Sequence, residues 1–309
     1  MNGNTNSPLV SIIINCYNGE KFLKEAIDSV FAQTYTNWEI ILWDNCSSDN
    51  SAEIAKKYGE KIKYYISEYN TTLGEARNQA LKKSKGDYVA FLDVDDIWHF
   101  NKLELQISSM LKEETSLSYT GCDIGINPKS FYVFRPKYFS GYIFGELIEQ
   151  FEIILPTAIL KKEILDELDI NFNTKIVASE EYDLFVQIAA IKPITVIKES
   201  LCFYRISSSS LTNKSINFRG QDRIVTLSTL KRKYPDVVRK NLSHFNKAKY
   251  KIWYYRFQAA LFYKNIKIAK LNISKIKYKD FRYFLIFLMI YISPVIYKKV
   301  LKIYDKRGM

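Results

Sequence analysis

The sequence predicts an α/β fold in which a mostly parallel central sheet is flanked by helices and followed by a basic helical extension. Two observations predict it. Over the first hundred residues, short apolar runs rich in β-branched residues alternate with segments of helical periodicity. From Phe218 onward the patterns are mostly helical and rich in lysine and aromatic residues. We therefore expect one domain over residues 1–215 and a helical, basic region over residues 216–309.

Strands and helices alternate regularly in the first part of the chain. Apolar runs predict strands at residues 9–14, 38–43, 62–66 and 88–92. Between them, helices are predicted at residues 20–33, 49–58 and 74–83, the first from apolar residues at helical spacing and the second from the capping serines before it. Strands joined by helices in this order form a parallel sheet with right-handed crossovers.

The pattern is looser after Asp96. Helices are predicted at residues 98–111, 164–168 and 180–190, and strands at 116–126, 131–134 and 201–206. Asn127-Pro128 predicts a turn between two of these strands. The sequence contains neither an internal repeat nor a glycine/serine linker.

Charge is distributed unevenly along the chain. The formal net charge is +12 over 309 residues, but from Lys231 to the end 21 basic residues face three acidic ones. The rest of the chain is therefore net negative, and the C-terminal region calls for an anionic partner. The four cysteines form no CxxC pair, which argues against a zinc site. The start of the chain lacks the features of a signal peptide, so we expect a cytoplasmic protein.

Four polar clusters follow predicted strands or open a helix: residues 15–18, 44–45, 70–74 and 93–96. The carboxyl ends of parallel strands share one edge of the sheet, where ligands of open α/β sheets bind. Asp93 and Asp95 could share a Mg²⁺ or Mn²⁺ ion, or could belong to a turn. Asp96 could be a helix cap, because a helix is expected to begin at Ile97-Trp98. Asp44 could accept a hydrogen bond from a base or ribose, or satisfy its own loop.

Two further candidates lie in predicted first turns of helices. Arg77 opposes the helix dipole unless it has an anionic partner such as a diphosphate, and otherwise it is a solvated surface residue. Glu180 and Glu181 are adjacent, so one could act as a general base while the other caps the helix. The alternative is an acidic first turn that only stabilises the helix dipole.

Taken together, these motifs resemble the bacterial family 2 glycosyltransferases, whose fold is called GT-A. Five segments in order carry the resemblance, which covers residues 8–210: Val10 to Asn18, Asp44 to Asp49, Gly74 to Asn78, Phe91 to Asp96 and Glu180 to Leu184. It implies an inverting, metal-dependent enzyme that moves a sugar from a nucleotide-sugar donor, with UDP as the expected nucleotide. The implied acceptor is a saccharide or a lipid-linked saccharide in surface glycan synthesis.

The resemblance also implies roles for individual residues. Asp95 and Asp93 would hold a divalent cation, Mg²⁺ or Mn²⁺, and Glu181 would be the catalytic base. Donor binding would involve Asn15, Tyr17, Asn18, Asp44, Arg77 and Asp93. Supporting roles would fall to Glu180, Asp96 and Arg205. Acceptor contacts are expected between Tyr119 and Thr157.

One position departs from the family pattern. The family often has His two residues after the equivalent of Arg205, where this chain has Ser207. The chain's two histidines, His99 and His244, lie elsewhere. This departure leaves open a non-catalytic sugar-nucleotide-binding or scaffolding subunit. A nucleotidyltransferase is disfavoured because residues 15–21 lack a glycine-rich basic loop, and a Rossmann dehydrogenase because GxGxxG is absent.

The C-terminal region combines an apolar segment with many cations. Residues 281–297 contain one charge, Arg282, and one helix breaker, Pro294, and lysines follow. The segment is at the short limit for crossing a bilayer. We expect a peripheral anchor on the anionic cytoplasmic leaflet of the inner membrane, with a helical extension packed on protein as the alternative. Nucleic-acid binding is not expected, because no nucleic-acid-binding module accompanies the charge.

Overall fold

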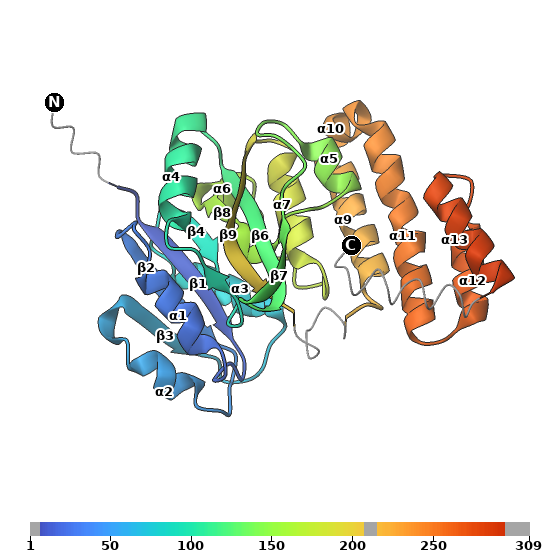
Figure 1. The fold of residues 1–309 in the computed structure, drawn as a ribbon. Helices are drawn as coiled ribbons and strands as arrows, with labels where there is room; N and C mark the ends of the chain where they lie inside the picture. The colour runs from blue at the N-terminus through green and yellow to red at the C-terminus, as the bar shows by residue number, and fades with distance from the viewer. Residues whose placement is uncertain (1–6, 207–214, 294–309) are drawn as a thin grey trace. The chain divides into compact units, whose positions relative to one another are not determined.

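A computed structural model describes residues 7–206 and 215–293 of the chain (Figure 1). The chain divides into two compact units. The first, called the sheet unit, comprises residues 1–147, 151–174 and 180–207, and the second, called the helical unit, comprises residues 148–150, 175–179 and 208–309. These units are defined by compactness alone, so the predicted division into domains of residues 1–215 and 216–309 stays a prediction.

The sheet unit contains a nine-stranded mixed sheet with the order β3-β2-β1-β4-β8-β6-β9-β5, and β7 pairs with β6. Its strands are β1 (Val10–Cys16), β2 (Trp38–Asp44), β3 (Ile62–Ile66), β4 (Tyr88–Phe91), β5 (Ile97–Trp98), β6 (Leu117–Asn127), β7 (Ser130–Phe134), β8 (Ile159–Lys161) and β9 (Ile194–Arg205). Strands β1 to β4 are parallel to one another, and β6 is parallel to β9. The predicted α/β fold with a mostly parallel sheet is confirmed.

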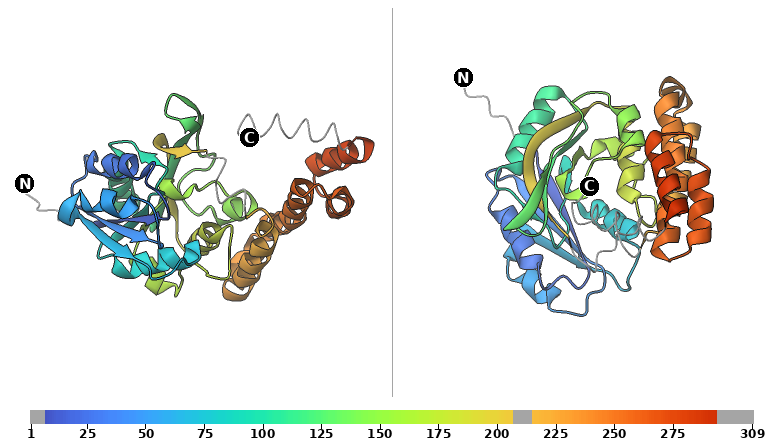
Figure 2. Two further views of the ribbon diagram at one scale, coloured as in Figure 1. Left: turned by 90° about the horizontal axis from the view of Figure 1, so that it is seen from below. Right: turned by 45° about the vertical axis from the view of Figure 1, so that its right-hand side comes forward.

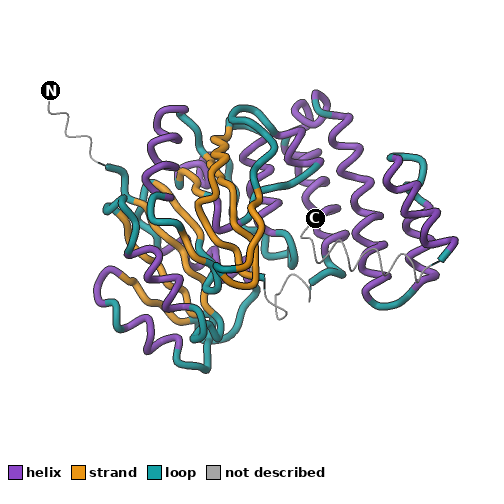
Figure 3. Tube along the Cα trace, in the orientation of Figure 1, coloured by secondary structure: helices purple, strands orange, loops and turns teal. Residues whose placement is uncertain are grey.

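Helices cover both faces of this sheet (Figures 1 and 3). They are α1 (Leu23–Phe31), α2 (Ser51–Lys56), α3 (Leu73–Lys83), α4 (Lys102–Glu113), α5 (Phe144–Glu149), which crosses the unit boundary, α6 (Glu163–Glu167) and α7 (Glu180–Ala189), with 3₁₀ turns at Gly59–Lys61 and Leu155–Thr157. Alternation along β1 explains the two-sided burial. Ile12 and Ile14 pack in the core that includes α1 and α4, whereas Ile13 is equally buried but faces the other side.

The sequence prediction of a helix from Trp98 is wrong. Residues Ile97–Trp98 form strand β5, which pairs antiparallel with β9 in the register Trp98 opposite Cys202. The Trp98 indole N–H also donates to the Pro156 carbonyl at 2.9 Å. These tertiary contacts outweigh the local helical pattern, so α4 begins only at Lys102 and Asp96 is not its cap. Similarly, the late strand begins at Ile194 rather than at Leu201.

The helical unit contains five helices among its described residues: α9 (Arg219–Lys233), α10 (Pro235–Lys240), α11 (Leu242–Phe262), α12 (Ile266–Ser274) and α13 (Phe281–Ile292). Its core joins α11, α12 and α13 through Phe257, Ala269, Ile273 and Ile290. Among residues 7–206 and 215–293, none of the helices combines the length and the apolar composition that a membrane span requires. The predictions that involve Ser207, Pro294 and the final lysines concern positions outside the described residues.

Candidate active site

The carboxyl ends of β1, β2 and β3 lie side by side, as the sequence predicts. Cys16 is in register with Asp44, and Asp44 with Ile66. Asn18, just after β1, adopts a left-handed conformation with φ of 51°, which asparagine tolerates better than most residues. Its side-chain oxygen accepts a hydrogen bond from the Ser48 N–H at 2.9 Å. The loops after the first two strands are therefore tied together.

The Asp44 carboxylate is buried and held at both oxygens. Its Oδ1 accepts the Ser47 N–H at 2.7 Å, and its Oδ2 accepts the Tyr64 hydroxyl at 2.7 Å. Burial and the hydrogen bond to Asp44 raise the pKa of Tyr64 well above its usual range, so Tyr64 stays a donor. A carboxylate oxygen accepts more than one hydrogen bond, which leaves Asp44 able to accept another. Its predicted role in binding a base stays a prediction.

Asn45 connects the loop after β2 to the start of α3. Its Oδ1 accepts the Thr71 N–H at 3.1 Å and the Thr71 hydroxyl at 2.9 Å, and its Nδ2 donates to the Thr71 carbonyl at 2.9 Å. The next residue, Thr72, caps α3 by accepting the Glu75 N–H at 3.3 Å. Sequence reasoning missed this function of Asn45, although the residue stands inside a recognised motif.

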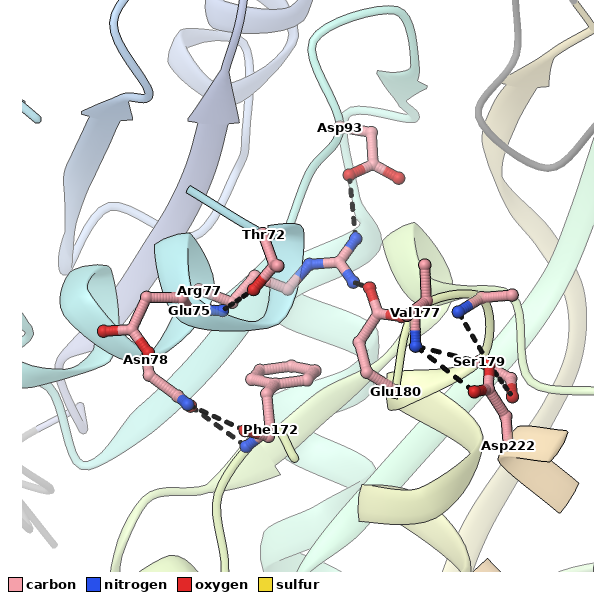
Figure 4. Close-up of polar contacts among 11 residues, drawn as sticks. Thr72, Glu75, Arg77, Asn78, Asp93, Phe172, Val177, Ser179, Glu180 and Asp222 are labelled. Carbon is pink, nitrogen blue, oxygen red and sulfur yellow. Dashed lines mark hydrogen bonds and ion pairs between the residues drawn. The ribbon is translucent and has the colours of Figure 1, made fainter. Parts of the chain in front are cut away.

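Arg77 links three elements at the edge of the sheet (Figure 4). The guanidinium Nη1 lies 2.5 Å from Glu180 Oε1 on α7, and Nη2 lies 3.5 Å from Asp93 Oδ1 after β4. The Phe172 ring lies 5.4 Å from the guanidinium carbon. Arg77 is 4 % exposed. The anionic partner that the sequence calls for is therefore supplied by the protein itself, and a contact between Arg77 and a donor stays a prediction.

A second arginine, Arg205, binds the loop after β4 that carries Asp93, Asp95 and Asp96, called the acidic loop below. The Arg205 backbone N–H donates to Asp96 Oδ1 at 2.8 Å, and its Nε donates to the Asp95 carbonyl at 2.8 Å. Its Nη2 lies 2.6 Å from Glu25 Oε2 on α1, a partner that the sequence does not reveal. The aromatic ring of Phe22 lies 4.3 Å from the guanidinium carbon. Arg205 thus fixes the backbone from which Asp95 and Asp96 project.

The three aspartates of this loop differ in environment. Asp93 is partly exposed, with 33 % of its side chain accessible. Burial, and then the neighbouring Asp93 charge, raise the pKa of Asp95 to about 6. Asp96 is 1 % exposed, and burial raises the pKa of this carboxyl well above its usual range. Its Oδ2 has no hydrogen-bond partner within residues 7–206 and 215–293.

The two glutamates at the start of α7 also differ. Glu180 is buried and pairs with Arg77, whereas Glu181 is partly exposed. Burial, and then the adjacent Glu180 carboxylate, raise the pKa of Glu181 above its ordinary value, while Arg77 opposes the shift. The sequence hypothesis of two different roles for the pair is consistent with these environments, but the role of Glu181 as a base stays a prediction.

The oxygen donors of the acidic loop fit a divalent cation that also binds a ligand. Asp93 and Asp95 supply carboxylate oxygens, which Mg²⁺ and Mn²⁺ prefer. Burial, and after it the Asp93 charge, raise the pKa of Asp95, and a cation between the two carboxylates would relieve their repulsion. Among the described residues, no group of three or more acidic, cysteine or histidine side chains could hold a metal ion alone.

Comparisons with known proteins concern the family and the fold of the chain. Residues 11–169 match the profile described as Glycosyl transferase family 2. The chain is similar to WfgD of Escherichia coli, described as a UDP-Glc:alpha-D-GlcNAc-diphosphoundecaprenol beta-1,3-glucosyltransferase, with 37 % identity over 211 residues, which cover 66 % of this chain and 80 % of WfgD.

Two solved structures share the fold. The first is Staphylococcus aureus TarS 1–349 in complex with UDP-GlcNAc, with a TM-score of 0.68 and 17 % identity over 97 % of this chain and 92 % of that one. The second is the mannosyltransferase PcManGT of Pyrobaculum calidifontis in complex with GDP-Man and Mn²⁺, with a TM-score of 0.60 and 18 % identity over 98 % of this chain and 89 % of that one. At this identity the likeness concerns the fold alone.

Proposed function

The chain belongs to glycosyl transferase family 2 and has the GT-A fold, and on that premise we propose that it transfers a sugar from a nucleotide-sugar donor with inversion at the anomeric carbon. The observation that carries the proposal is the junction at Arg77. This one side chain contacts both the Asp93 loop and the helix that begins at Glu180-Glu181. The predicted metal-binding residues and the predicted base are thus held at the same edge of the sheet.

For the donor we propose a UDP-sugar. The nucleoside would contact the loops after β1 and β2, where Asn15, Tyr17 and Asn18 lie beside Asp44. Tyr17 is 55 % exposed, and the Nδ2 of Asn15 is a buried donor without a partner in the described structure. Asp44 would accept an N–H of the base. WfgD, a relative named for its use of UDP-Glc, supports this choice of nucleotide.

The diphosphate of the donor would lie next to the acidic loop. Asp95 and Asp93 would hold Mg²⁺ or Mn²⁺ together with diphosphate oxygens. When bound, such a cation neutralises charge that develops on the leaving diphosphate. PcManGT, a structure of the same fold solved with Mn²⁺, supports the use of a divalent cation. Arg205 would keep the loop in place through its hydrogen bond to the Asp95 carbonyl.

Glu181 would then act as the general base. Its carboxylate takes the proton from an acceptor hydroxyl as that oxygen attacks the anomeric carbon. The bond between this carbon and the diphosphate oxygen breaks on the opposite face, which inverts the configuration. Burial and the Glu180 charge raise the pKa of Glu181 to about 8, so its ionised form is a stronger base than an ordinary glutamate and is populated increasingly as the pH approaches 8. The Arg77–Glu180 pair would fix the first turn of α7 and with it the position of Glu181.

The acceptor that we propose is a saccharide, free or lipid-linked, in surface glycan synthesis. WfgD is named for a diphosphoundecaprenol-linked acceptor, which supports the lipid-linked form. We place the protein peripherally on the cytoplasmic face of the membrane, with the helical unit as its anchor. Exposed apolar residues of that unit include Leu271, Tyr278 and Phe281, and lysines stand between them.

The proposal is tested by substituting the predicted base. A screen of sugar nucleotides, with product detection by mass spectrometry, identifies the donor. Glu181→Gln is then expected to lower kcat by about 10²- to 10⁴-fold, because general base catalysis contributes that much. Glu163→Gln, an exposed carboxylate on α6, is the matched control and should retain full activity.

Binding and turnover must be measured separately to exclude a non-catalytic subunit. Titration calorimetry with UDP and Mn²⁺ reports binding, and Asp95→Asn is expected to weaken the Mn²⁺-dependent part of it. Full transfer activity in Glu181→Gln would reject the assigned base. UDP binding without turnover of any sugar nucleotide by the unaltered protein would favour the sugar-nucleotide-binding subunit instead.

A further inference from the structure

The β6–β7 hairpin of the sheet unit exposes an unusual number of apolar side chains. The hairpin and the segment after it, residues 124–145, are called the aromatic hairpin below. Its exposed large apolar residues are Ile126 at 69 %, Phe131 at 47 %, Tyr132 at 37 %, Val133 at 38 %, Phe139 at 77 % and Tyr142 at 74 %. Phe131 and Val133 alternate with Tyr132 along β7 and so share one face of the hairpin, and exposed apolar side chains gathered in this way mark an interaction site. Figure 2 (left) shows the hairpin projecting from the rest of the sheet unit.

The charge of the aromatic hairpin is of one sign. It contains Lys129, Arg135 and Lys137 and no acidic residue, whereas the chain before Lys231 as a whole is net negative. All three cations are exposed. Apolar and aromatic side chains surrounded by lysine and arginine are the features of surfaces that bind an anionic bilayer. The charge therefore selects an anionic, apolar partner.

Backbone pairing and side-chain hydrogen bonds hold the aromatic hairpin in place. β7 pairs along its length with β6, from Cys122 opposite Phe134 to Asn127 opposite Ser130. The following segment is held by Glu152, which accepts the Lys137 N–H at 3.1 Å, and by Lys198, whose Nζ donates to the Pro136 carbonyl at 2.7 Å. Side chains on such a support can enter the interfacial region of a bilayer without the cost of ordering a loop.

The turn end of the hairpin adjoins the edge of the sheet that carries the proposed catalytic residues. Gly125 on β6 is in register with Arg205 on β9, and Arg205 binds the backbone of the acidic loop. The Phe131 and Phe203 rings are 6.5 Å apart, and Phe203 is in register with Ile97, the residue after Asp96. A partner on the hairpin would therefore lie close to the end of the sheet where an acceptor must enter.

We propose that the aromatic hairpin is a membrane-docking element of the sheet unit, which inserts Ile126, Phe131 and Val133 into the interface of an anionic bilayer. Lys129, Arg135 and Lys137 then contact lipid phosphates. This contact brings the catalytic edge to the surface in which a lipid-linked acceptor lies, independently of any contact made by the helical unit. The purpose of this contact rests on the proposed function. The contact itself does not, because the test below measures membrane binding and needs no enzymatic turnover.

The test measures binding of the full chain to vesicles. Vesicles of phosphatidylcholine with about three parts in ten of phosphatidylglycerol provide the anionic surface, and pure phosphatidylcholine provides the neutral one. Phe131→Ser with Val133→Ser is expected to weaken sedimentation with anionic vesicles by about tenfold. Lys129→Glu, at the exposed turn, is expected to weaken it severalfold. Leu111→Ser, an equally exposed apolar residue on α4 of the same unit, is the matched control.

A local probe separates the hairpin from the helical unit. An environment-sensitive fluorophore on Phe131→Cys, in a Cys46→Asn background that removes the exposed native cysteine, should shift to the blue on anionic vesicles and be quenched by brominated lipid. An unshifted probe on a protein that sediments with vesicles would overturn the proposal. So would sedimentation velocity showing that the serine substitutions dissociate a dimer, since the hairpin would then be an interface between copies. Circular dichroism and melting curves verify that each variant is folded.

Discussion

Replacing Lys102 by methionine should remove a pH dependence of stability that the buried lysine creates. Lys102 is fully buried at the start of α4, where its Nζ lies 2.6 Å from Gln106 Oε1 and 4.3 Å from the centre of the Trp98 ring. Burial lowers its pKa from 10.5 to about 7. Between these two pH values the unfolded chain binds a proton that the folded chain lacks. The free energy of unfolding therefore rises with pH, by up to about 1.4 kcal/mol per pH unit.

The magnitude follows from the two pKa values. From pH 7 to pH 9 the gain is about 2 kcal/mol, and at pH 7 the lysine destabilises the fold by about 4 kcal/mol. Methionine removes this penalty but leaves the Gln106 oxygen without its hydrogen bond, which costs about 1–3 kcal/mol. We expect Lys102→Met to raise the free energy of unfolding at pH 7 by roughly 2 kcal/mol. Its stability should then vary less between pH 7 and 9.

Urea unfolding at pH 7, 8 and 9 measures this effect. The quantity of interest is the difference between the unaltered protein and the variant, because other groups also titrate in this range and cancel in the difference. Lys112→Met, an exposed lysine in the last turn of the same helix, is the control and should leave the slope unchanged. A difference that is constant across the three pH values would refute the reasoning, since Lys102 would then keep its proton in the folded state.

Three further predictions concern the proposed site. Tyr64→Phe removes a hydrogen bond to Asp44, so steady-state kinetics should show KM for the donor rising by about three- to tenfold with little change in kcat. An unchanged KM would show that Asp44 does not bind the donor. Because burial raises the pKa of Glu181, kcat/KM should climb with pH as this carboxyl ionises, and this rise should be absent in Glu181→Gln. The same pKa shift should lower the free energy of unfolding as the pH rises from 4.5, the ordinary pKa of the carboxyl, towards its pKa in the folded protein. Arg77→Met removes the ion pair with the buried Glu180, so chemical denaturation should show the free energy of unfolding falling by about 3–5 kcal/mol. The double variant Arg77→Met with Glu180→Gln should recover part of this loss, and strictly additive losses would argue against coupling between the two side chains.

The sheet and the edge where the site lies could be predicted from the sequence. Parallel strands are buried on both faces, so they stand out as apolar runs such as residues 10–14, and the polar residues that follow them must meet at one edge. This reasoning correctly placed Asp44 next to the end of β1. Family motifs added the candidate roles, which are predictions that kinetics must test.

What the sequence did not reveal depends on contacts between distant segments. Strand β5 has only two residues, too few for any periodicity, and exists because β9 pairs with it. Arg77 was expected to face a ligand, but its partners come from residues 16 and 103 positions away in sequence. Lys102 would be judged a surface lysine of a helix from sequence alone. Its burial depends on packing that no local pattern specifies.

The antiparallel β5–β9 pair also constrains when the acidic loop can form during synthesis. The Arg205 N–H that binds Asp96 is supplied 109 residues later in the chain. At ribosomal rates of about 5–20 residues per second, Asp96 waits roughly 5–20 s for this partner. Over that interval the nascent chain can pair β1 to β4, whose contacts are closer in sequence. The acidic loop, however, still lacks the hydrogen bond between Asp96 and the Arg205 N–H. A premature stop before codon 205 would therefore release a chain that retains the early strands yet lacks a completed acidic loop.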